Sequence, residues 1–297
     1  MTKFRIGRHI NTGPGFLTAP ADAEELGCQI MQIFLGNPQE SVSKAKSDSD
    51  LQAFSAELKV HKMKVVIHGH YTINLCHDPS ASRFRTSVKA LVSDLNSSSV
   101  IGNRCLGVII HMGKNVSEPK ISDTQALQNY VRGLQTALAE TLRFSNTTII
   151  LETGAGVGRE VGTKLDALAQ IYHALSPEEK LRVRFCIDTC HIWSAGYNIG
   201  TVSGAQKFFT EFDDKIGIDR IACIHLNNSK ADIGSNVDRH ADLSDGYIEL
   251  NGLEKIVQIA RKHSIPIIME TPLDKINPRT NAEITFADEL RLVKKWI

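Results

Sequence analysis

The chain has 297 residues, of which 42% are apolar, and its formal net charge at pH 7 is +1. These values are ordinary for a soluble globular enzyme. A net charge this close to zero does not point to nucleic acid, so a DNA-binding function would require basic residues grouped on one face. The sequence contains no run of about 18 apolar residues, which excludes a membrane-spanning helix.

The cysteines and the first residues indicate an intracellular protein. Residues 1–7 are not followed by an apolar segment of signal-peptide length. The cysteines lack C-x-x-C spacing and mostly lie in apolar runs, which is typical of reduced thiols; they are Cys28, Cys76, Cys105, Cys186, Cys190 and Cys223. We therefore expect a cytoplasmic protein, or a nuclear or virion protein if the source is a eukaryote or a virus.

Short apolar runs alternate with amphipathic stretches from one end of the chain to the other. Most of the runs are continuously apolar, which predicts strands buried on both faces of a parallel sheet. The runs are Phe4–Gly7, Cys28–Leu35, Lys64–His68, Cys105–His111, Thr147–Glu152, Val183–Asp188, Ile221–His225 and Ile265–Glu270. Apolar residues three and four apart predict helices between them, near 51–58, 88–95, 127–138, 165–172, 208–212 and 253–259, with a last helix over 284–297.

Eight strand–helix units predict a (β/α)8 TIM barrel. The alternative is an open doubly wound sheet. The barrel is favoured by the number of units, by a length near the usual ~250 residues plus loops, and by the lack of an early G-x-G-x-x-G. No linker or composition shift divides the chain, so we expect one domain over residues 1–297. The polar segment Ser41–Asp50 is either a loop or the exposed start of a helix.

Six successive predicted strands end in a residue that can bind a metal ion. These residues are His68, His111, Glu152, Asp188, His225 and Glu270, and they follow one another at intervals of 36 to 45 residues. In a barrel, the carboxyl ends of the strands converge on one mouth, where catalytic residues lie. His191 follows Asp188 by three residues. Asp238 and His240 are two residues apart, so in an extended loop their side chains point the same way.

Together these nine residues offer five imidazoles and four carboxylates. This ligand set favours zinc, at about three ions per chain. Magnesium and calcium are disfavoured because imidazole is a poor ligand for hard cations. The alternative is that the polar strand ends hydrogen-bond one another without a metal. Cys190 lies between two candidate ligands and is interpreted as a buried neighbour.

Several motifs resemble those of the endonuclease IV family, the zinc-dependent apurinic/apyrimidinic endonucleases of base-excision repair. The most specific are C-I-D-T-C-H (186–191), H-L-N-N-S-K…G-S-N-V-D-R-H (225–240) and L-E-T-G-A-G-V-G (151–158), supported by H-G-H-Y-T-I-N-L (68–75) and I-M-E-T (268–271). The resemblance covers nearly the whole chain. It implies a trinuclear zinc enzyme that cuts duplex DNA 5′ to an abasic site and leaves a 3′-hydroxyl. We also expect removal of 3′-blocking groups, because the metal ions would hold the phosphate itself.

The resemblance also implies a role for each candidate ligand. One zinc would be held by His68, His111 and Glu152; a second by Glu152, Asp188, His225 and Glu270; and a third by His191, Asp238 and His240. Glu152 would bridge two ions, and Glu270 would orient the attacking water, which makes these two the expected catalytic residues. Three positions depart from the family pattern: Gln39 stands for an Arg, Asn228 for an Asp and Ser244 for a Gly.

The expected partner is double-stranded DNA containing abasic sites, bound by a monomer. Tyr71 follows His68 by three residues and is expected to stack in the gap left by the missing base; the alternative is a core tyrosine. Asn37 and Gln39 lie in a loop that the resemblance places in the minor groove. Asn227, Ser229 and Lys230 follow His225 and are expected to contact the DNA backbone. For Lys230 an ordinary surface position is an equal alternative.

Two other functions fit parts of this pattern. A barrel sugar isomerase or epimerase would have the same fold, but it would hold about one or two divalent ions mainly through carboxylates, and the five histidines argue against it. A non-catalytic zinc protein that recognises damaged DNA would bind an abasic duplex without cutting it. The complete ligand set argues against such a decayed enzyme.

Overall fold

The structure is a computed structural model that describes residues 4–39, 45–116, 118–143, 146–272, 275–276 and 283–297. Within these residues, eight parallel strands form a closed barrel in the order β1-β10-β7-β6-β5-β4-β3-β2. They are β1 (Ile6–His9), β2 (Ile30–Ile33), β3 (Lys64–His68), β4 (Cys105–Ile110), β5 (Ile149–Glu152), β6 (Val183–Asp188), β7 (Ile221–His225) and β10 (Ile267–Met269). The predicted barrel is therefore confirmed.

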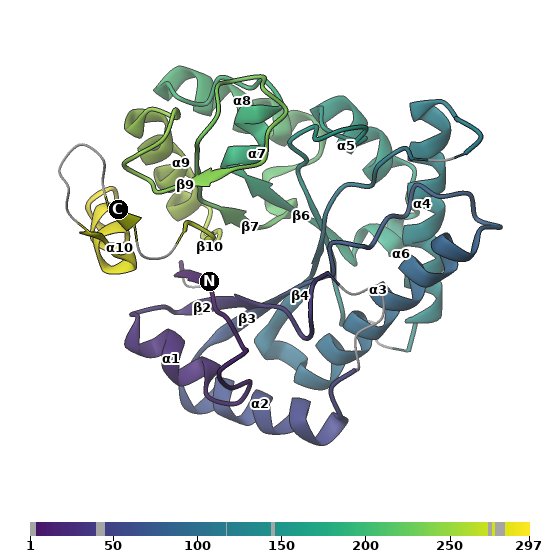
Figure 1. Cartoon of the computed structure of the whole chain (residues 1–297), viewed down its shortest axis with the longest axis horizontal. Helices are drawn as coiled ribbons and strands as arrows, with labels where there is room; N and C mark the ends of the chain where they lie inside the picture. The colour runs from purple at the N-terminus through teal and green to yellow at the C-terminus, as the bar shows by residue number, and fades with distance from the viewer. Residues whose placement is uncertain (1–3, 40–44, 117, 144–145, 273–274, 277–282) are drawn as a thin grey trace.

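Helices surround the strands on the outside (Figure 1). They are α1 (Ala19–Glu25), α2 (Asp48–Val60), α3 (Ser82–Ile101), α4 (Asp123–Glu140), α5 (Leu165–His173), α6 (Pro177–Lys180), α7 (Thr189–Ser194), α8 (Val202–Lys215), α9 (Leu250–Lys262) and α10 (Phe286–Lys295). Two antiparallel hairpins were not expected from the sequence: β8 (Asn228–Ser229) with β9 (His240–Ala241), and β11 (Lys275–Ile276) with β12 (Glu283–Ile284). None of the described helices is both long and apolar enough to span a membrane.

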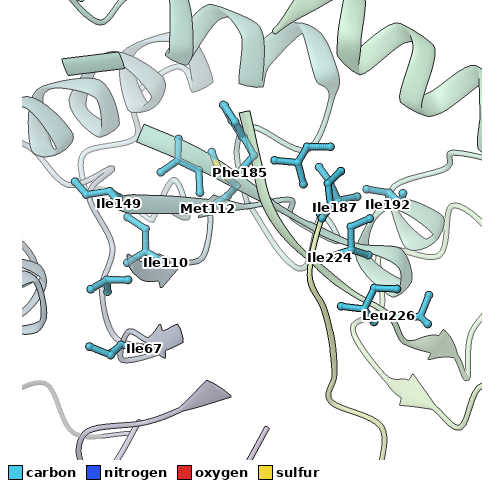
Figure 2. Close-up of a cluster of buried hydrophobic side chains, with 14 of the residues drawn as sticks. Ile67, Ile110, Met112, Ile149, Phe185, Ile187, Ile192, Ile224 and Leu226 are labelled. Atoms are coloured by element: carbon cyan, nitrogen blue, oxygen red, sulfur yellow. The ribbon is translucent and has the colours of Figure 1, made fainter. Parts of the chain in front are cut away.

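Side chains on the strands alternate between two apolar layers. The larger layer lies between the barrel and the helices, and Figure 2 shows a part of it in which Ile110, Phe185 and Ile224 extend from three different strands. The smaller layer fills the inside of the barrel and consists of Ile30, Val66, Ile109, Ile150, Cys186, Cys223 and Ile268, all fully buried. Because side chains alternate along a strand, the residue two positions after each inward residue also points inward, at the carboxyl end.

This alternation explains why the candidate metal ligands lie at the carboxyl ends of the strands. His68 follows Val66, Glu152 follows Ile150, Asp188 follows Cys186, His225 follows Cys223 and Glu270 follows Ile268. Each pair therefore places an apolar side chain in the interior and a polar side chain at the mouth. A one-residue shift of any of these strands would exchange the two faces.

Several predicted boundaries differ from the structure. The first strand is Ile6–His9 and not Phe4–Gly7, and the second is shorter than the predicted run Cys28–Leu35. Within Ser41–Asp50, residues 41–44 lie outside the described residues. The described part confirms a helix start, because the Ser47 side chain accepts a hydrogen bond from the Asp50 N–H and α2 begins at Asp48.

Candidate metal centre

Three groups of histidine and carboxylate donor atoms, without cysteine, lie at the carboxyl ends of the barrel strands. The first consists of His68, His111 and Glu152, whose donor atoms all lie within 4.8 Å of one another. The Glu152 Oε2 atom lies 3.4 Å from His68 Nε2 and 3.4 Å from His111 Nδ1. These three residues end or follow β3, β4 and β5, so adjacent strands build the group.

The second group consists of Glu152, Asp188, His225 and Glu270, again within 4.8 Å of one another. Its centre is His225 Nδ1, which lies 2.8 Å from Glu152 Oε1, 3.2 Å from Glu270 Oε2 and 3.6 Å from Asp188 Oδ2. Glu152 therefore directs one carboxylate oxygen to the first group and the other to the second.

The third group consists of His191, Asp238 and His240. The Asp238 Oδ1 atom lies 3.2 Å from His191 Nε2 and 3.3 Å from His240 Nε2. His191 is fixed by its own neighbour in the sequence, because the Asp188 side chain caps α7 and accepts a hydrogen bond from the His191 N–H at 2.9 Å. The β8–β9 hairpin pairs Ser229 with His240 and brings the distant end of this loop back to the mouth.

Buried atoms in these groups lack the partners that such atoms normally have. Glu152 Oε2, His191 Nε2 and His240 Nε2 are buried and have no hydrogen-bond partner among the described residues. An unsatisfied buried polar atom is costly, and native proteins rarely keep one without a reason such as a bound ion. Two imidazole nitrogens and a carboxylate oxygen are suitable zinc ligands. The residues present therefore fit a metal ion at each of these places.

Comparison with known proteins identifies the family to which this chain belongs. A family model described as Xylose isomerase-like TIM barrel matches residues 20–296. A putative endonuclease 4 from Acanthamoeba polyphaga mimivirus is 55% identical over 293 residues, which are 99% of this chain and 93% of that protein. The chain belongs to the endonuclease IV family.

Other endonuclease IV relatives agree with this result. Apurinic-apyrimidinic endonuclease 1 from Saccharomyces cerevisiae is 31% identical over 279 residues, which are 92% of this chain and 73% of that protein. The crystal structure of endonuclease IV from Thermus thermophilus has a TM-score of 0.81 and 27% identity, and the match covers 98% of each chain. The protein is accordingly an enzyme of the hydrolase class.

In this endonuclease IV member, hydrogen bonds orient the imidazole rings. His68 Nδ1 lies 2.8 Å from the Gly69 carbonyl oxygen, and His191 Nδ1 lies 2.7 Å from the Thr153 carbonyl oxygen. A carbonyl only accepts, so both Nδ1 atoms carry a proton, and in the neutral form of each ring Nε2 has a free lone pair. Such outer contacts fix the tautomer of a metal-binding histidine.

Sequence reasoning missed the residues that support His225 and Glu270. The Gln32 side chain accepts a hydrogen bond from His225 Nε2 at 2.7 Å and donates one to Glu270 Oε1 at 2.5 Å. His9 Nδ1 lies 3.1 Å from Gln32 Nε2. The sequence contains a signal for Gln32 and for His9. Gln32 is a polar residue inside an apolar run. His9 is an additional histidine at a strand end, once β1 is extended to its observed last residue.

The charged groups shift one another's pKa values. Burial would raise the pKa of Glu152, but His111 and His225 hold it well below its usual range. Burial would lower the pKa of His225, but acidic neighbours that include Glu270 raise it well above its usual range. Burial lowers the pKa of His111 to about 4. The Glu152 carboxylate therefore stays ionised at neutral pH, and its negative charge favours a cation at this mouth.

A cleft of about 610 Å³ opens onto the three groups. Tyr71 lines it with 56% of its surface exposed, and its ring centroid lies 5.7 Å from that of His68 and 5.6 Å from that of His111. The Tyr71 N–H donates a hydrogen bond to the Pro38 carbonyl oxygen at 3.0 Å. The alternative of a core tyrosine is therefore wrong, and the loop that contains Asn37 and Gln39 lies beside Tyr71.

Two of the expected DNA contacts need correction. Asn227 and Ser229 are completely buried, so they cannot reach a DNA backbone. The Asn227 side chain donates to Asp188 Oδ2 at 2.8 Å and accepts from the Glu270 N–H at 2.8 Å, which makes it a support for two candidate ligands. Lys230 is exposed. This exposure is compatible with a DNA contact and with an ordinary surface position, so both alternatives stay open.

The departure at Asn228 has a structural explanation. Its side-chain amide donates hydrogen bonds of 2.9 Å to the carbonyl oxygens of Leu243 and Ile248, and a carboxylate could make neither. The same side chain leaves no room at Gly246, where an added Cβ would lie 2.2 Å from the Asn228 oxygen. Asn228 and Gly246 thus form one unit that shapes the loop after the β8–β9 hairpin.

Cys190 is fully buried in α7. Burial raises the pKa of its thiol to about 12, so the thiol keeps its proton at neutral pH. A metal ligand would have to be the thiolate. The Cys190 Sγ atom lies within 4.8 Å of donor atoms of Asp188 and His240, so the interpretation of Cys190 as a neighbour of the ligands stays a prediction.

Proposed function

We propose that this protein is a DNA-repair endonuclease that hydrolyses the phosphodiester bond 5′ to an abasic site in duplex DNA and leaves a 3′-hydroxyl. The observation that supports this best is the position of Glu152, whose two oxygens face two separate donor groups. The relatives named endonuclease 4 and apurinic-apyrimidinic endonuclease support the substrate. A DNA substrate places the enzyme inside a cell or a virion, and one chain contains all three groups, so we expect a monomer.

We assign about three zinc ions to the mouth of the barrel, one to each donor group. The ligands are His68, His111 and Glu152; Glu152, Asp188, His225 and Glu270; and His191, Asp238 and His240. When bound, zinc supplies positive charge for the phosphoryl oxygens and makes a water molecule acidic near neutral pH. Three divalent ions exceed the charge of the four carboxylates, so the loaded mouth attracts a phosphate group.

The protein's own side chains position the reacting groups. Glu152 fixes the separation of the first two donor groups because its carboxylate spans them. Glu270 is 17% exposed at its side chain, so it lines the cleft and can orient an attacking water by accepting a hydrogen bond from it. Gln32 and Asn227 hold Glu270 in place, through its side chain and its backbone N–H respectively. This rigid support keeps the carboxylate within reach of the scissile phosphate.

The exposed residues around the cleft suggest how the enzyme recognises DNA. Tyr71 stands at its edge with its ring free to stack where a base is missing. Asn37 and Gln39 lie in the adjacent loop, and Lys230 directly follows β8 in the segment after β7. We assign the minor-groove contact to the loop of Asn37 and Gln39 and a backbone contact to Lys230.

The same site should also release blocked 3′ ends, such as a 3′-phosphate. Because the proposed contacts bind the phosphate and not a base, the absence of a nucleotide on one side removes no contact with the chain. A primer with a 3′-phosphate should therefore become extendable by a polymerase after treatment with the enzyme. A primer that stays blocked would exclude this second activity.

The proposed function is tested by metal analysis together with a cleavage assay. Native mass spectrometry should find about three zinc ions per chain, and the same preparation should cut a duplex with a single tetrahydrofuran site on its 5′ side. A ketose incubated in parallel should remain unchanged. One ion per chain with ketose turnover would favour a sugar epimerase, and tight binding of the duplex without a cut would favour a damage-binding protein.

A further inference from the structure

A second cavity lies at the opposite end of the barrel, where the strands begin. It has a volume of about 710 Å³ and is lined by residues that include Arg5, Lys64, Leu106, Arg184, Ile221 and Pro266. Lys64 and Arg184 precede the barrel-filling residues Val66 and Cys186 by two positions, so they share the inward face of β3 and β6. Stability alone would favour branched apolar residues in this layer.

Within the described part of the chain, the cations of this cavity form no ion pair, although Asp219 also lines the cavity. The Lys64 ammonium donates to the Asn103 carbonyl oxygen at 2.5 Å, and Arg184 donates to the Asp219 carbonyl oxygen at 2.6 Å. Among the described residues, neither of them nor Arg5 forms an ion pair, and the Asp219 carboxylate lies 3.2 Å from the Arg220 guanidinium instead. Peptide carbonyls satisfy donors but do not neutralise charge.

Neighbouring positive charges act on Lys64. Burial lowers the pKa of Lys64, and the positive charges of Arg104 and Arg5 lower it further. Arg104, in the short helix before β4, donates to the Met63 carbonyl oxygen at 3.5 Å. A group of like charges that is held without counter-ions is unfavourable, and it becomes favourable when an anion binds among them.

We propose that this N-terminal mouth binds a small, multiply charged phosphate anion, with Lys64, Arg184 and Arg5 as its ligands. Guanidinium groups bind phosphate through paired hydrogen bonds, and an ammonium adds a compact charge. The apolar lining, with Leu106, Ile221 and Pro266, leaves a surface on which a nucleoside could pack. Free pyrophosphate and the phosphates of a nucleotide share this chemistry, and experiment separates the two sources.

The test uses the full-length zinc enzyme and isothermal titration with pyrophosphate, inorganic phosphate and a nucleoside diphosphate. Arg184→Gln and Lys64→Gln should each weaken pyrophosphate binding about 10-fold or more, the loss expected for one charge-assisted hydrogen bond. Arg184→Lys should retain much of the affinity. The matched control is Lys89→Gln on the exposed side of α3, which should bind like the parent.

The outcomes separate this site from the metal centre, which also attracts phosphate. Equal pyrophosphate binding by the parent and all variants would show binding at the metal centre or an adventitious ion only, and it would overturn the proposal. Displacement of pyrophosphate by undamaged duplex DNA, with loss of DNA affinity in Lys64→Gln, would also overturn it, because the cavity would then contact DNA. A nucleoside diphosphate that binds more tightly than pyrophosphate identifies a nucleotide site, and equal affinities identify the phosphate group alone.

Thermal unfolding gives a second check, because a ligand that binds the folded protein raises its melting temperature. Without added anion, Lys64→Gln should be at least as stable as the parent, because the substitution relieves repulsion. Pyrophosphate should raise the melting temperature of the parent and of Lys89→Gln, and it should raise that of Lys64→Gln by less at the same concentration. A Lys64→Gln protein that is less stable yet equally stabilised by pyrophosphate would contradict the proposal.

Discussion

Glu152 is fully buried, and each of its oxygens faces a different donor group. Glu152→Gln keeps the shape but cannot place a shared negative charge between two cations. The variant should lose more than ~100-fold in cleavage rate, the low end for removing a key electrostatic group, while its affinity for abasic duplex stays within a few-fold. The control is Glu140→Gln at the exposed end of α4. Single-turnover rates of Glu152→Gln within a few-fold of the parent would contradict the bridging role of Glu152.

Tyr71 combines exposure with a fixed position beside His68 and His111. Tyr71→Ala should weaken binding to abasic duplex by ~10–150-fold, which corresponds to ~1–3 kcal/mol of stacking. Binding to undamaged duplex should barely change, because phosphate contacts supply most of it. Tyr247→Ala serves as the control, since Tyr247 is 53% exposed and does not line the cleft.

Fluorescence anisotropy on matched duplexes at two salt concentrations measures the effect of Tyr71→Ala. Equal losses on damaged and intact DNA would mean that Tyr71 supports the mouth and that another residue fills the gap. Gln39→Arg should tighten binding to both duplexes and steepen the salt dependence by roughly one ion, because it adds one phosphate contact.

Asn228 illustrates how a single amide shapes a loop. Asn228→Asp would turn two hydrogen bonds to the Leu243 and Ile248 carbonyls into contacts between oxygen atoms. We expect a loss of about 2–3 kcal/mol in the free energy of unfolding, the usual cost of unsatisfied buried groups. Urea unfolding at pH 7 measures it, with Asn251→Asp on the exposed face of α9 as the charge-matched control. Indistinguishable unfolding curves for both variants would contradict this account.

At the scale of elements, α10 connects two loops of the metal centre. Its buried Glu289 accepts a hydrogen bond from the Thr271 hydroxyl at 2.5 Å and another from the Leu243 N–H at 3.1 Å. Thr271 follows the candidate ligand Glu270 directly, and Leu243 follows His240 by three residues. The last helix of the chain therefore fixes segments that carry ligands of two different groups.

Glu289→Ala should weaken metal retention by about 10-fold, the lower end for a residue that positions metal ligands. Glu289→Gln should stay near the parent, because its oxygen can accept from Leu243 and its amide can donate to the Thr271 hydroxyl. Competition with a chromogenic chelator measures the metal affinity directly. Parental affinity in Glu289→Ala would show that α10 contributes to folding only.

The strand ends were predictable because strand length and side-chain alternation are local properties. Continuous apolar runs indicate where each strand lies, and the first polar residue after a run must lie at the mouth of a parallel barrel. The support residues were not predictable in the same way. Gln32 interrupts an apolar run, but only the closed barrel brings it next to His225 and Glu270, which are far away in the sequence.

The burial of Asn227 and Ser229 could not be predicted from the sequence pattern either. Polar residues after a strand predict an exposed loop, yet here the β8–β9 hairpin and the loop held by Asn228 cover them. The two hydrogen bonds that Asn228 donates join residues 15 and 20 positions apart. No apolar periodicity marks such a segment, because its order comes from hydrogen bonds to backbone atoms.

At the scale of the whole molecule, one buried acid makes stability depend on pH. Asp94 on α3 is 5% exposed, and its Oδ2 has no hydrogen-bond partner among the described residues. Burial raises its pKa to about 7. The folded protein therefore binds this proton more tightly than the unfolded chain, and the free energy of unfolding falls as the pH rises from about 4 to about 7.

Asp94→Asn should remove the part of this dependence that Asp94 contributes, because an amide has no charge to desolvate. At pH 8 we expect the variant to be more stable than the parent by roughly 1–3 kcal/mol, and the difference should shrink toward pH 5. Urea unfolding of both proteins at several pH values provides the measurement. Two curves that stay parallel across this range would show that Asp94 is not the group responsible.

The barrel can close only after its last strand in the sequence has been synthesised. The last barrel strand, β10, pairs with β1 on one side and with β7 on the other. A nascent chain that stops before β10 already contains His68, His111 and Glu152, but it keeps two open strand edges and lacks Glu270. Open edges invite pairing between chains. Interrupted translation of this protein would therefore yield fragments that aggregate. Only a chain that contains β10 can form the closed barrel.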